Sequence, residues 1–248
     1  MGNVLEDSAE TYLSNLKLIL LFSIPFLIAF LIPRFAPIPT YISAGAIFLR
    51  TASIFINLNA INLAVIVVAI FFSLLFISFA FVAISLIVKA KRTHVGTQKR
   101  VMQGIERYTS KVFLVFLAYT FVLVIASIIG YYLGHEALLT ALVGFIGFLF
   151  IFYAPTAIVI DNKRIFRAVL DSAKLMATAP QYFLIWLALI VVVVAVLDGV
   201  FILVLGGSAA GIVASRYILL ILNSLFILPY FVIFQAEAYM KKFPLLRH

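Results

Sequence analysis

The sequence contains no cysteine, and this absence excludes disulfide bonds, thiolate metal sites and cysteine nucleophiles. Charge is also scarce: 11% of the 248 residues are charged, whereas soluble domains have about 25%. Motifs for phosphate-binding loops, nucleophile elbows and paired metal-binding histidines are missing, and no two carboxylates share a predicted span. We therefore expect no enzyme, no catalytic residues, no cofactor and no metal site.

Hydrophobic residues, by contrast, make up 66% of the chain, against roughly 45–50% in soluble domains. A soluble domain of this size cannot bury so much apolar surface. Several uncharged stretches reach the length of about 20 residues that a helix needs to cross a bilayer. The composition therefore predicts an all-α fold: a polytopic transmembrane bundle that forms a single integral membrane domain over residues 1–248.

Uncharged windows predict six spans. Between the first two lies the only long outer connection, in which Pro33, Pro37 and Pro39 are expected to end the first helix. Two interpretations of residues 40–59 stay open, an outer cap or a loop that re-enters the membrane. The predicted spans are Leu16–Ile32, Ala60–Val88, Val112–Leu133, Ala137–Ile160, Tyr182–Leu205 and Tyr217–Gln235.

Basic residues predict the orientation of the bundle. Fifteen of the 18 Lys and Arg residues lie on one side of the predicted membrane, and Arg34, Arg50 and Arg216 lie on the other. Cytoplasmic loops carry the excess of Lys and Arg, so both termini are expected in the cytoplasm and the protein in the inner cell membrane. The net charge of +9 then reflects topology, and no nucleic-acid partner is expected.

Three segments share one pattern, a short amphipathic helix followed by two spans, which predicts repeat units over about 3–92, 97–162 and 163–242. In the third copy, apolar residues such as Phe166 and Leu170 recur at helical spacing, and Arg167 and Asp171 are placed for an ion pair on the opposite face. A helix of about 12 residues is too short to cross the membrane, so we expect it to lie in the interface.

Basic side chains of the second and third copies are expected to contact lipid headgroups or a protein partner. Membrane lipids are the expected partners, and a membrane protein or a second copy of the chain is the alternative. The candidate contact residues are Lys99, Arg100, Arg107, Arg164, Arg167 and Lys174.

Two stretches, "YAPTAIVIDNKRIFRAVLDSAKLMATAPQYFLIWL" and "LPYFVIFQAEAYM", carry a resemblance to a known family. They resemble a broad group of uncharacterised six-span membrane proteins. That group includes YciC-type inner-membrane proteins, archaeal relatives and the membrane domain of some glycerophosphoryl diester phosphodiesterases. The resemblance implies a six-span fold and no activity, because nothing in the chain resembles the phosphodiesterase catalytic domain. Relatives often have a glycine turn before the short helix, where this chain has Asp161-Asn162-Lys163.

A few polar residues fall within or beside the last two spans. Asp198 lies about 24 Å along the fifth helix from Tyr182, near its outer boundary. Arg216 begins the sixth span on the same side and could pair with it, and Asn223 lies inside that span. An interfacial ion pair and a coupling-ion or substrate site both fit Asp198. The sequence thus supports two hypotheses: a non-enzymatic protein that organises lipid or a partner complex, and a transporter or permease-like subunit.

Overall fold

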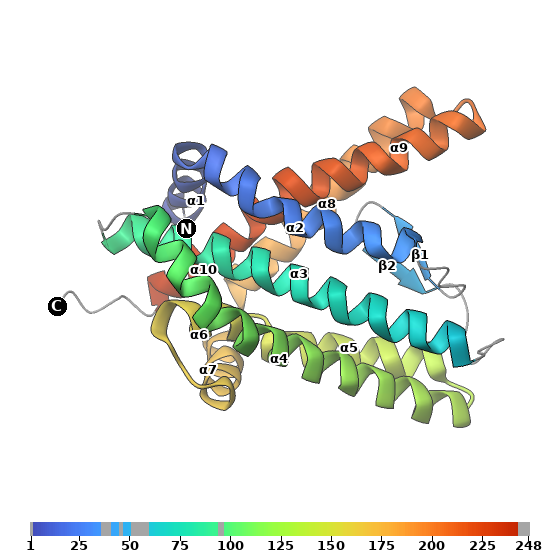
Figure 1. Ribbon diagram of the computed structural model, residues 1–248, viewed down its shortest axis with the longest axis horizontal. Coiled ribbons are helices and arrows are strands. Elements are labelled where there is room, and N and C mark those ends of the chain that lie inside the picture. The colour runs from blue at the N-terminus through green and yellow to red at the C-terminus, as the bar shows by residue number, and fades with distance from the viewer. Residues whose placement is uncertain (1, 36–40, 45–46, 51–59, 94–96, 243–248) are drawn as a thin grey trace.

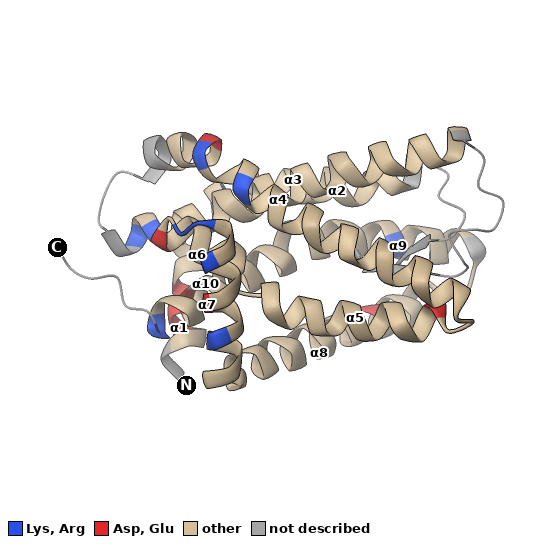
Figure 2. Cartoon of the chain, turned by 90° about the horizontal axis from the view of Figure 1, so that it is seen from below, with Lys and Arg blue, Asp and Glu red and all other residues tan. Residues whose placement is uncertain are grey.

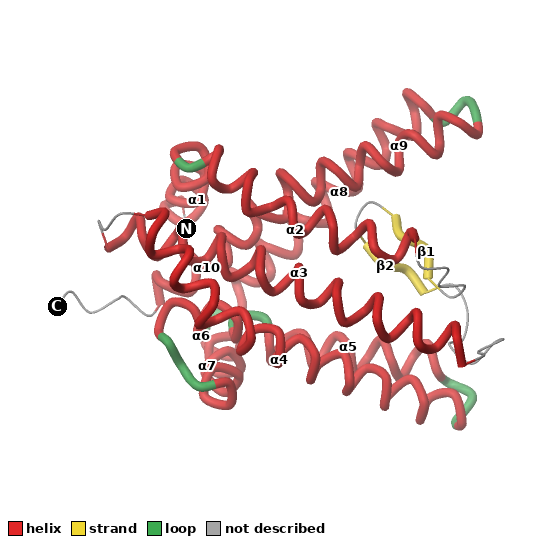
Figure 3. Tube along the Cα trace, viewed as in Figure 1, coloured by secondary structure: helices red, strands yellow, loops and turns green. Residues whose placement is uncertain are grey.

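The computed structural model describes residues 2–35, 41–44, 47–50, 60–93 and 97–242. Helix dominates this part of the chain (Figure 3). The elements are α1 (Gly2–Ser14), α2 (Leu16–Phe35), β1 (Tyr41–Ala44), β2 (Ile47–Arg50), α3 (Ala60–Thr93), α4 (Thr97–Tyr132), α5 (Glu136–Ile151), α6 (Ala154–Asp161), α7 (Ile165–Thr178), α8 (Pro180–Leu205), α9 (Ala209–Leu222), a π-helical turn (Asn223–Ile227) and α10 (Leu228–Lys242).

Within the described residues, six helical segments are long and apolar enough to cross a membrane. Each overlaps one of the six predicted spans, so the predicted all-α bundle is confirmed and the protein is an integral membrane protein. The observed segments are Leu16–Pro33, Ile61–Lys91, Val101–Tyr132, Glu136–Asp161, Pro180–Leu205 and Ala210–Lys242.

Helices α2, α3, α4 and α5 run side by side, each in contact with the next (Figure 1). The hairpin of α8 and α9 points away from them, as the orange ribbon in Figure 1 shows. On α8 only Phe183 is buried, and Leu203 is 86% exposed. In a bilayer, such an apolar surface faces lipid.

The core lies toward one end of the bundle. There α3 is buried from Ala80 to Val88, α6 from Ala154 to Ile160, and α10 from Phe231 to Met240. The short helices α1 and α7 lie at this same end (Figure 1). Tight packing in a membrane depends on close van der Waals contact, since lipid tails are as apolar as the side chains. This end is therefore the best-packed part of the bundle.

Charged residues gather at the same end, as the blue and red segments of Figure 2 show around α1, α6, α7 and the end of α10. We call this the charged end: α1, the facing ends of α3 and α4, α6, α7 and the last turns of α10. Helix α1 and the end of α10 lie together at this end. The predicted separation of basic residues across the membrane stays a prediction. The cytoplasmic orientation of this end stays a prediction.

Short amphipathic helices were expected at the start of all three copies. Helices α1 and α7 are separate from the spans that follow them, as expected. The expectation was wrong for the second copy, because α4 is one continuous helix from Thr97 to Tyr132. No proline interrupts those residues, whereas Pro180 begins the span after α7 and cannot donate a backbone hydrogen bond.

The three copies nevertheless share one pattern of burial. In each, residues at positions i, i+4 and i+7 are buried against the bundle. The threefold repeat stays a prediction, and this common spacing supports it. The buried residues are Val4, Ser8 and Thr11 in α1, Val101, Ile105 and Tyr108 in α4, and Ala168, Ser172 and Leu175 in α7.

The turn between α6 and α7 is made at Asn162. Asn162 follows the last residue of α6 with φ 52°, in the left-handed region. Asparagine is one of the few residues with a side chain that adopt this conformation routinely. Asn162 therefore makes the turn for which glycine would otherwise be needed.

The connection between α2 and α3 contains a small β-hairpin that the sequence did not predict. Strands β1 and β2 are antiparallel, with Tyr41 opposite Arg50. Helix α2 continues through Pro33 to Phe35, so Pro33 does not end it, and Pro37 and Pro39 lie outside the described residues. Residues 51–59, part of the segment for which a cap and a re-entrant loop were considered, also lie outside them.

Candidate functional site

The fourth span is broken within the core. Pro155, in the first turn of α6, has no N–H to donate, and the helix is interrupted at Phe152 and Tyr153. The N–H of Tyr153 donates to Ser172 Oγ at 2.9 Å, and Gln235 Nε2 donates to the carbonyl oxygen of Phe152. All four residues are buried. Helix α7 and helix α10 therefore satisfy the backbone groups that the break leaves without helical partners.

A polar network joins α6, α7 and α10 just beyond this break. Lys163 Nζ lies 3.0 Å from Asp161 Oδ2 and 2.9 Å from Asp171 Oδ2. The same ammonium group donates to the Tyr239 hydroxyl at 3.0 Å, and that hydroxyl donates to Asp161 at 2.6 Å. Burial alone lowers the pKa of Lys163, but its hydrogen bonds with Asp171, Tyr239 and Asp161 outweigh burial, so the pKa lies above its usual value.

A second network fixes α1 to the bundle. Lys91 Nζ lies 2.9 Å from Glu10 Oε1 and donates to Thr11 Oγ1 at 3.4 Å. The Thr11 hydroxyl donates to Glu237 Oε1 at 3.1 Å. Glu237 is 2% exposed, so its carboxylate depends on such partners. The two networks hold the short helices against α3 and α10 and give the charged end a defined shape.

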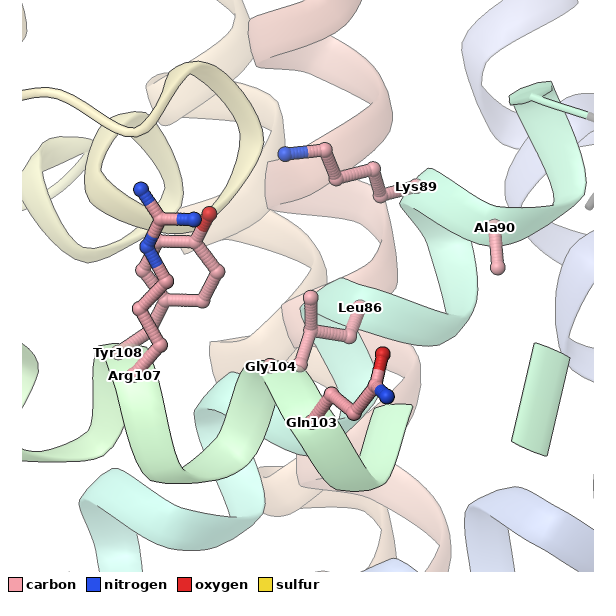
Figure 4. Close-up of a pocket in the computed structure, with 7 residues that line it drawn as sticks. All are labelled: Leu86, Lys89, Ala90, Gln103, Gly104, Arg107 and Tyr108. Atoms are coloured by element: carbon pink, nitrogen blue, oxygen red, sulfur yellow. The ribbon is translucent and has the colours of Figure 1, made fainter. Parts of the chain in front are cut away.

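A hollow of about 300 Å³ opens between α3 and α4 at the charged end (Figure 4). In Figure 4 the Lys89 side chain extends from α3, and the side chains of Arg107 and Tyr108 extend next to each other from α4. Lys89 Nζ donates to the carbonyl oxygen of Val159 at 2.9 Å, which fixes the position of its ammonium group. The lining is Leu86, Lys89, Ala90, Gln103, Gly104, Arg107 and Tyr108.

An apolar cavity of about 180 Å³ lies within the bundle, where α2, α3, α4, α5, α6, α8 and α10 converge. Its walls are mainly aromatic, and the Gln235 side chain adds a polar group. The indole of Trp186 donates to the carbonyl oxygen of Phe231 at 3.2 Å, which orients the ring at the cavity wall. The aromatic lining includes Phe26, Phe81, Phe116, Phe148, Trp186 and Phe231.

The predicted contact residues fall into two groups at the charged end. Arg167 and Lys174 are exposed on α7, and Arg164 is exposed at its N-cap. Arg107 is exposed on α4, where it lines the hollow. Lys99 and Arg100 lie in the first turn of α4, and their side chains are outside the described part of the structure.

The predicted ion pair between Arg167 and Asp171 is wrong. Asp171 pairs with Lys163 instead. The turn at Asn162 brings Lys163 back against α7, so this lysine reaches Asp171 from outside the helix. Arg167 is consequently left exposed on the outer surface of α7.

The polar residues of the last two spans do not converge on one site. Asp198 is half-buried on α8, Arg216 is exposed on α9, and within the described residues neither forms an ion pair. The ion pair considered for these two residues is therefore not seen. Asn223 is 3% exposed and begins the π-helical turn ahead of Pro229.

Several residues of these networks were not singled out from the sequence. The aromatic hydroxyl of Tyr239, the amide of Gln235 and the ammonium of Lys163 act through contacts with other helices. Pro155 was the available signal, because a proline within a span leaves backbone groups that another helix must satisfy.

Among the described residues, no three His, Cys, Asp or Glu side chains cluster as metal ligands. Comparison of the chain with protein-family models, with curated proteins and with solved structures finds no match. Any assignment of function therefore depends on the geometry of the chain itself.

Proposed function

We propose that the protein is a non-enzymatic integral membrane protein that binds and organises acidic lipid through its charged end. The exposed surface of α7 is the observation that carries this proposal. Phe166 is 76% exposed and Leu170 is 53% exposed, next to the exposed cations of Arg167 and Lys174. Apolar and basic side chains that share the outer surface of a short helix are typical of helices in the membrane interface.

The opposite surface of α7 gives this proposal a structural basis. Ala168, Ser172 and Leu175 are buried against the bundle, so the helix cannot turn its exposed side chains inward. A cation near an acidic bilayer surface gains about 1 kcal/mol, which makes the basic residues of α7 a useful electrostatic contact. The proposal includes two further points. We place the protein in the inner cell membrane, and we consider it similar to YciC-type proteins.

We expect replacement of Arg164, Arg167 and Lys174 by glutamine to weaken the preference for acidic lipid. The unfolding temperature of the purified protein should rise when phosphatidylglycerol replaces phosphatidylcholine in mixed micelles. In the triple variant this rise should fall by at least about half, because up to three favourable contacts are removed. Intrinsic fluorescence during heating measures the effect.

A matched comparison uses single variants at opposite ends of the bundle. Arg167→Gln removes one exposed cation from the charged end, and Arg216→Gln removes one from α9. Only the first should reduce the lipid-dependent rise. An equal reduction in both variants, or no reduction in the triple variant, would contradict the proposal.

The alternative is a transporter or permease-like subunit with a site near the fifth and sixth spans. The aromatic cavity and the π-helical turn at Asn223–Ile227 favour it, since π-turns are frequent at functional sites. Asp198 favours it less, because its helix α8 has only Phe183 buried. Solute flux into protein-containing vesicles that disappears in Asp198→Asn would support this alternative over lipid binding.

A further inference from the structure

The hollow between α3 and α4 has a closed floor. A side-chain carbon added at Gly104 would lie 2.6 Å from Leu86 Cδ1, so the two helices cross with Leu86 directly over the glycine. Figure 4 shows Leu86 above Gly104, with Gln103 beside them. The close crossing seals one side of the space, and its volume of about 300 Å³ is at the lower limit of small-ligand pockets.

Three cations surround a single aromatic ring beside this hollow. Lys89 Nζ lies 5.8 Å from the centroid of the Tyr108 ring, Arg107 Cζ lies 5.6 Å from it, and Lys111 Nζ lies 5.8 Å from it. The negative faces of the ring attract these cations. The ring carries no net charge, so their mutual repulsion is only partly offset.

For two of the three cations, no carboxylate within the described residues offsets this repulsion. In the part of the chain that the structure describes, Arg107 and Lys111 form no ion pair with Asp or Glu. An anion held between α3 and α4 would reduce the repulsion. The guanidinium of Arg107 can bind two oxygens of one phosphate side by side, and the amide of Gln103 can donate a further hydrogen bond.

We propose that this hollow is a binding site for a phosphate group, with Arg107 as its principal ligand, Lys89 and Gln103 in support, and Lys111 adding positive charge beside it. The proposal deepens the proposed function and rests on it, because it assigns one specific site within the charged end. It concerns different residues from the exposed surface of α7, so the two can fail separately.

The depth of the hollow fits two sources of phosphate. Lys89 lies two residues before the end of the span Ile61–Lys91, at the level where a lipid headgroup would stand. The phosphate of a phospholipid could reach the site from the membrane, and free phosphate could reach it from solution. Both offer the same oxygens to Arg107.

Two titrations test the site and separate the sources. Inorganic phosphate is titrated calorimetrically into lipid-free protein in detergent, and short-chain phosphatidic acid is titrated in the same way. Arg107→Gln should weaken binding of the effective ligand by roughly tenfold or more, because it removes charge-assisted hydrogen bonds. Arg107→Lys keeps the charge but loses the paired geometry and should weaken binding about threefold.

Arg216→Gln is the matched control, since it removes an exposed cation of α9 that belongs neither to this hollow nor to the surface of α7. It should change binding in these titrations by less than about twofold. Binding of inorganic phosphate would identify free phosphate as a source, and binding of phosphatidic acid alone would identify the headgroup.

The proposal is overturned if neither ligand binds, or if Arg107→Gln and Arg216→Gln weaken binding equally. The thermal unfolding temperature of each variant shows whether it is folded. Loss of phosphate binding in Arg107→Gln, with the lipid-dependent stabilisation through α7 retained, would support the site. If Arg107→Gln retains both phosphate binding and the lipid-dependent stabilisation, the site is contradicted and the proposed function is unaffected.

Discussion

Replacing Ser172 by alanine and Gln235 by leucine together is expected to lower the free energy of unfolding by about 3–6 kcal/mol. The substitutions remove the acceptor of the Tyr153 N–H and the donor to the Phe152 carbonyl oxygen. Both backbone groups are buried in the interior of the bundle, where water cannot replace the lost partners. Each single variant should lose roughly half as much.

Unfolding by sodium dodecyl sulfate in mixed micelles measures this loss. Ser215→Ala is the control, because the Ser215 hydroxyl donates only to the carbonyl oxygen of Ile212 in its own helix. That change should alter the free energy of unfolding by less than about 0.5 kcal/mol. Similar losses for Ser172→Ala and Ser215→Ala would show that the break in the fourth span does not need α7.

Replacing Lys163 by methionine is expected to lower the free energy of unfolding by about 2 kcal/mol. Removing one partner of a fully buried ion pair costs about 3–5 kcal/mol, and partial solvent exposure reduces that figure. The Lys163 side chain is 23% exposed, and it serves both Asp161 and Asp171. Methionine keeps most of the length of the side chain, so the loss reports on the ammonium group.

The pH dependence of this loss has a defined sign. The folded pKa of Lys163 lies above its usual value, so its contribution is complete below that usual value and disappears only as the pH rises beyond it. The difference between wild type and Lys163→Met attributable to the lysine proton should therefore be constant from about pH 6 to pH 9.

Lys174→Met provides the comparison, because Lys174 is exposed on the same helix. In lipid-free micelles it should cost less than about 0.5 kcal/mol. Equal losses for Lys163→Met and Lys174→Met would mean that the network of Lys163, Asp161, Asp171 and Tyr239 does not stabilise the fold.

The spans were predictable because a bilayer demands long apolar helices, and their length and composition are visible in one sequence. The side chains that hydrogen-bond to the break in the fourth span were not predictable. Pro155 marked a place where backbone groups could lack helical partners, but Ser172 lies 19 residues from Tyr153, and Gln235 lies 83 residues from Phe152. Which helix reaches the break depends on how the helices pack.

The same reasoning explains the errors at the charged end. Spacing within α7 suggested that Arg167 would pair with Asp171, but Lys163 reaches that carboxylate across the turn at Asn162. The basic hollow combines Lys89 of α3 with Arg107 of α4, and its floor depends on the close crossing at Gly104. A helical pattern predicts which residues share a face, and it does not predict which faces meet.

The central claim is that the charged end binds acidic lipid. Its most direct test is native mass spectrometry of the wild-type protein released from vesicles that contain equal amounts of phosphatidylglycerol and phosphatidylcholine. Two or more favourable contacts near the surface predict that phosphatidylglycerol is retained about tenfold more often. Equal retention of the two lipids would contradict the claim.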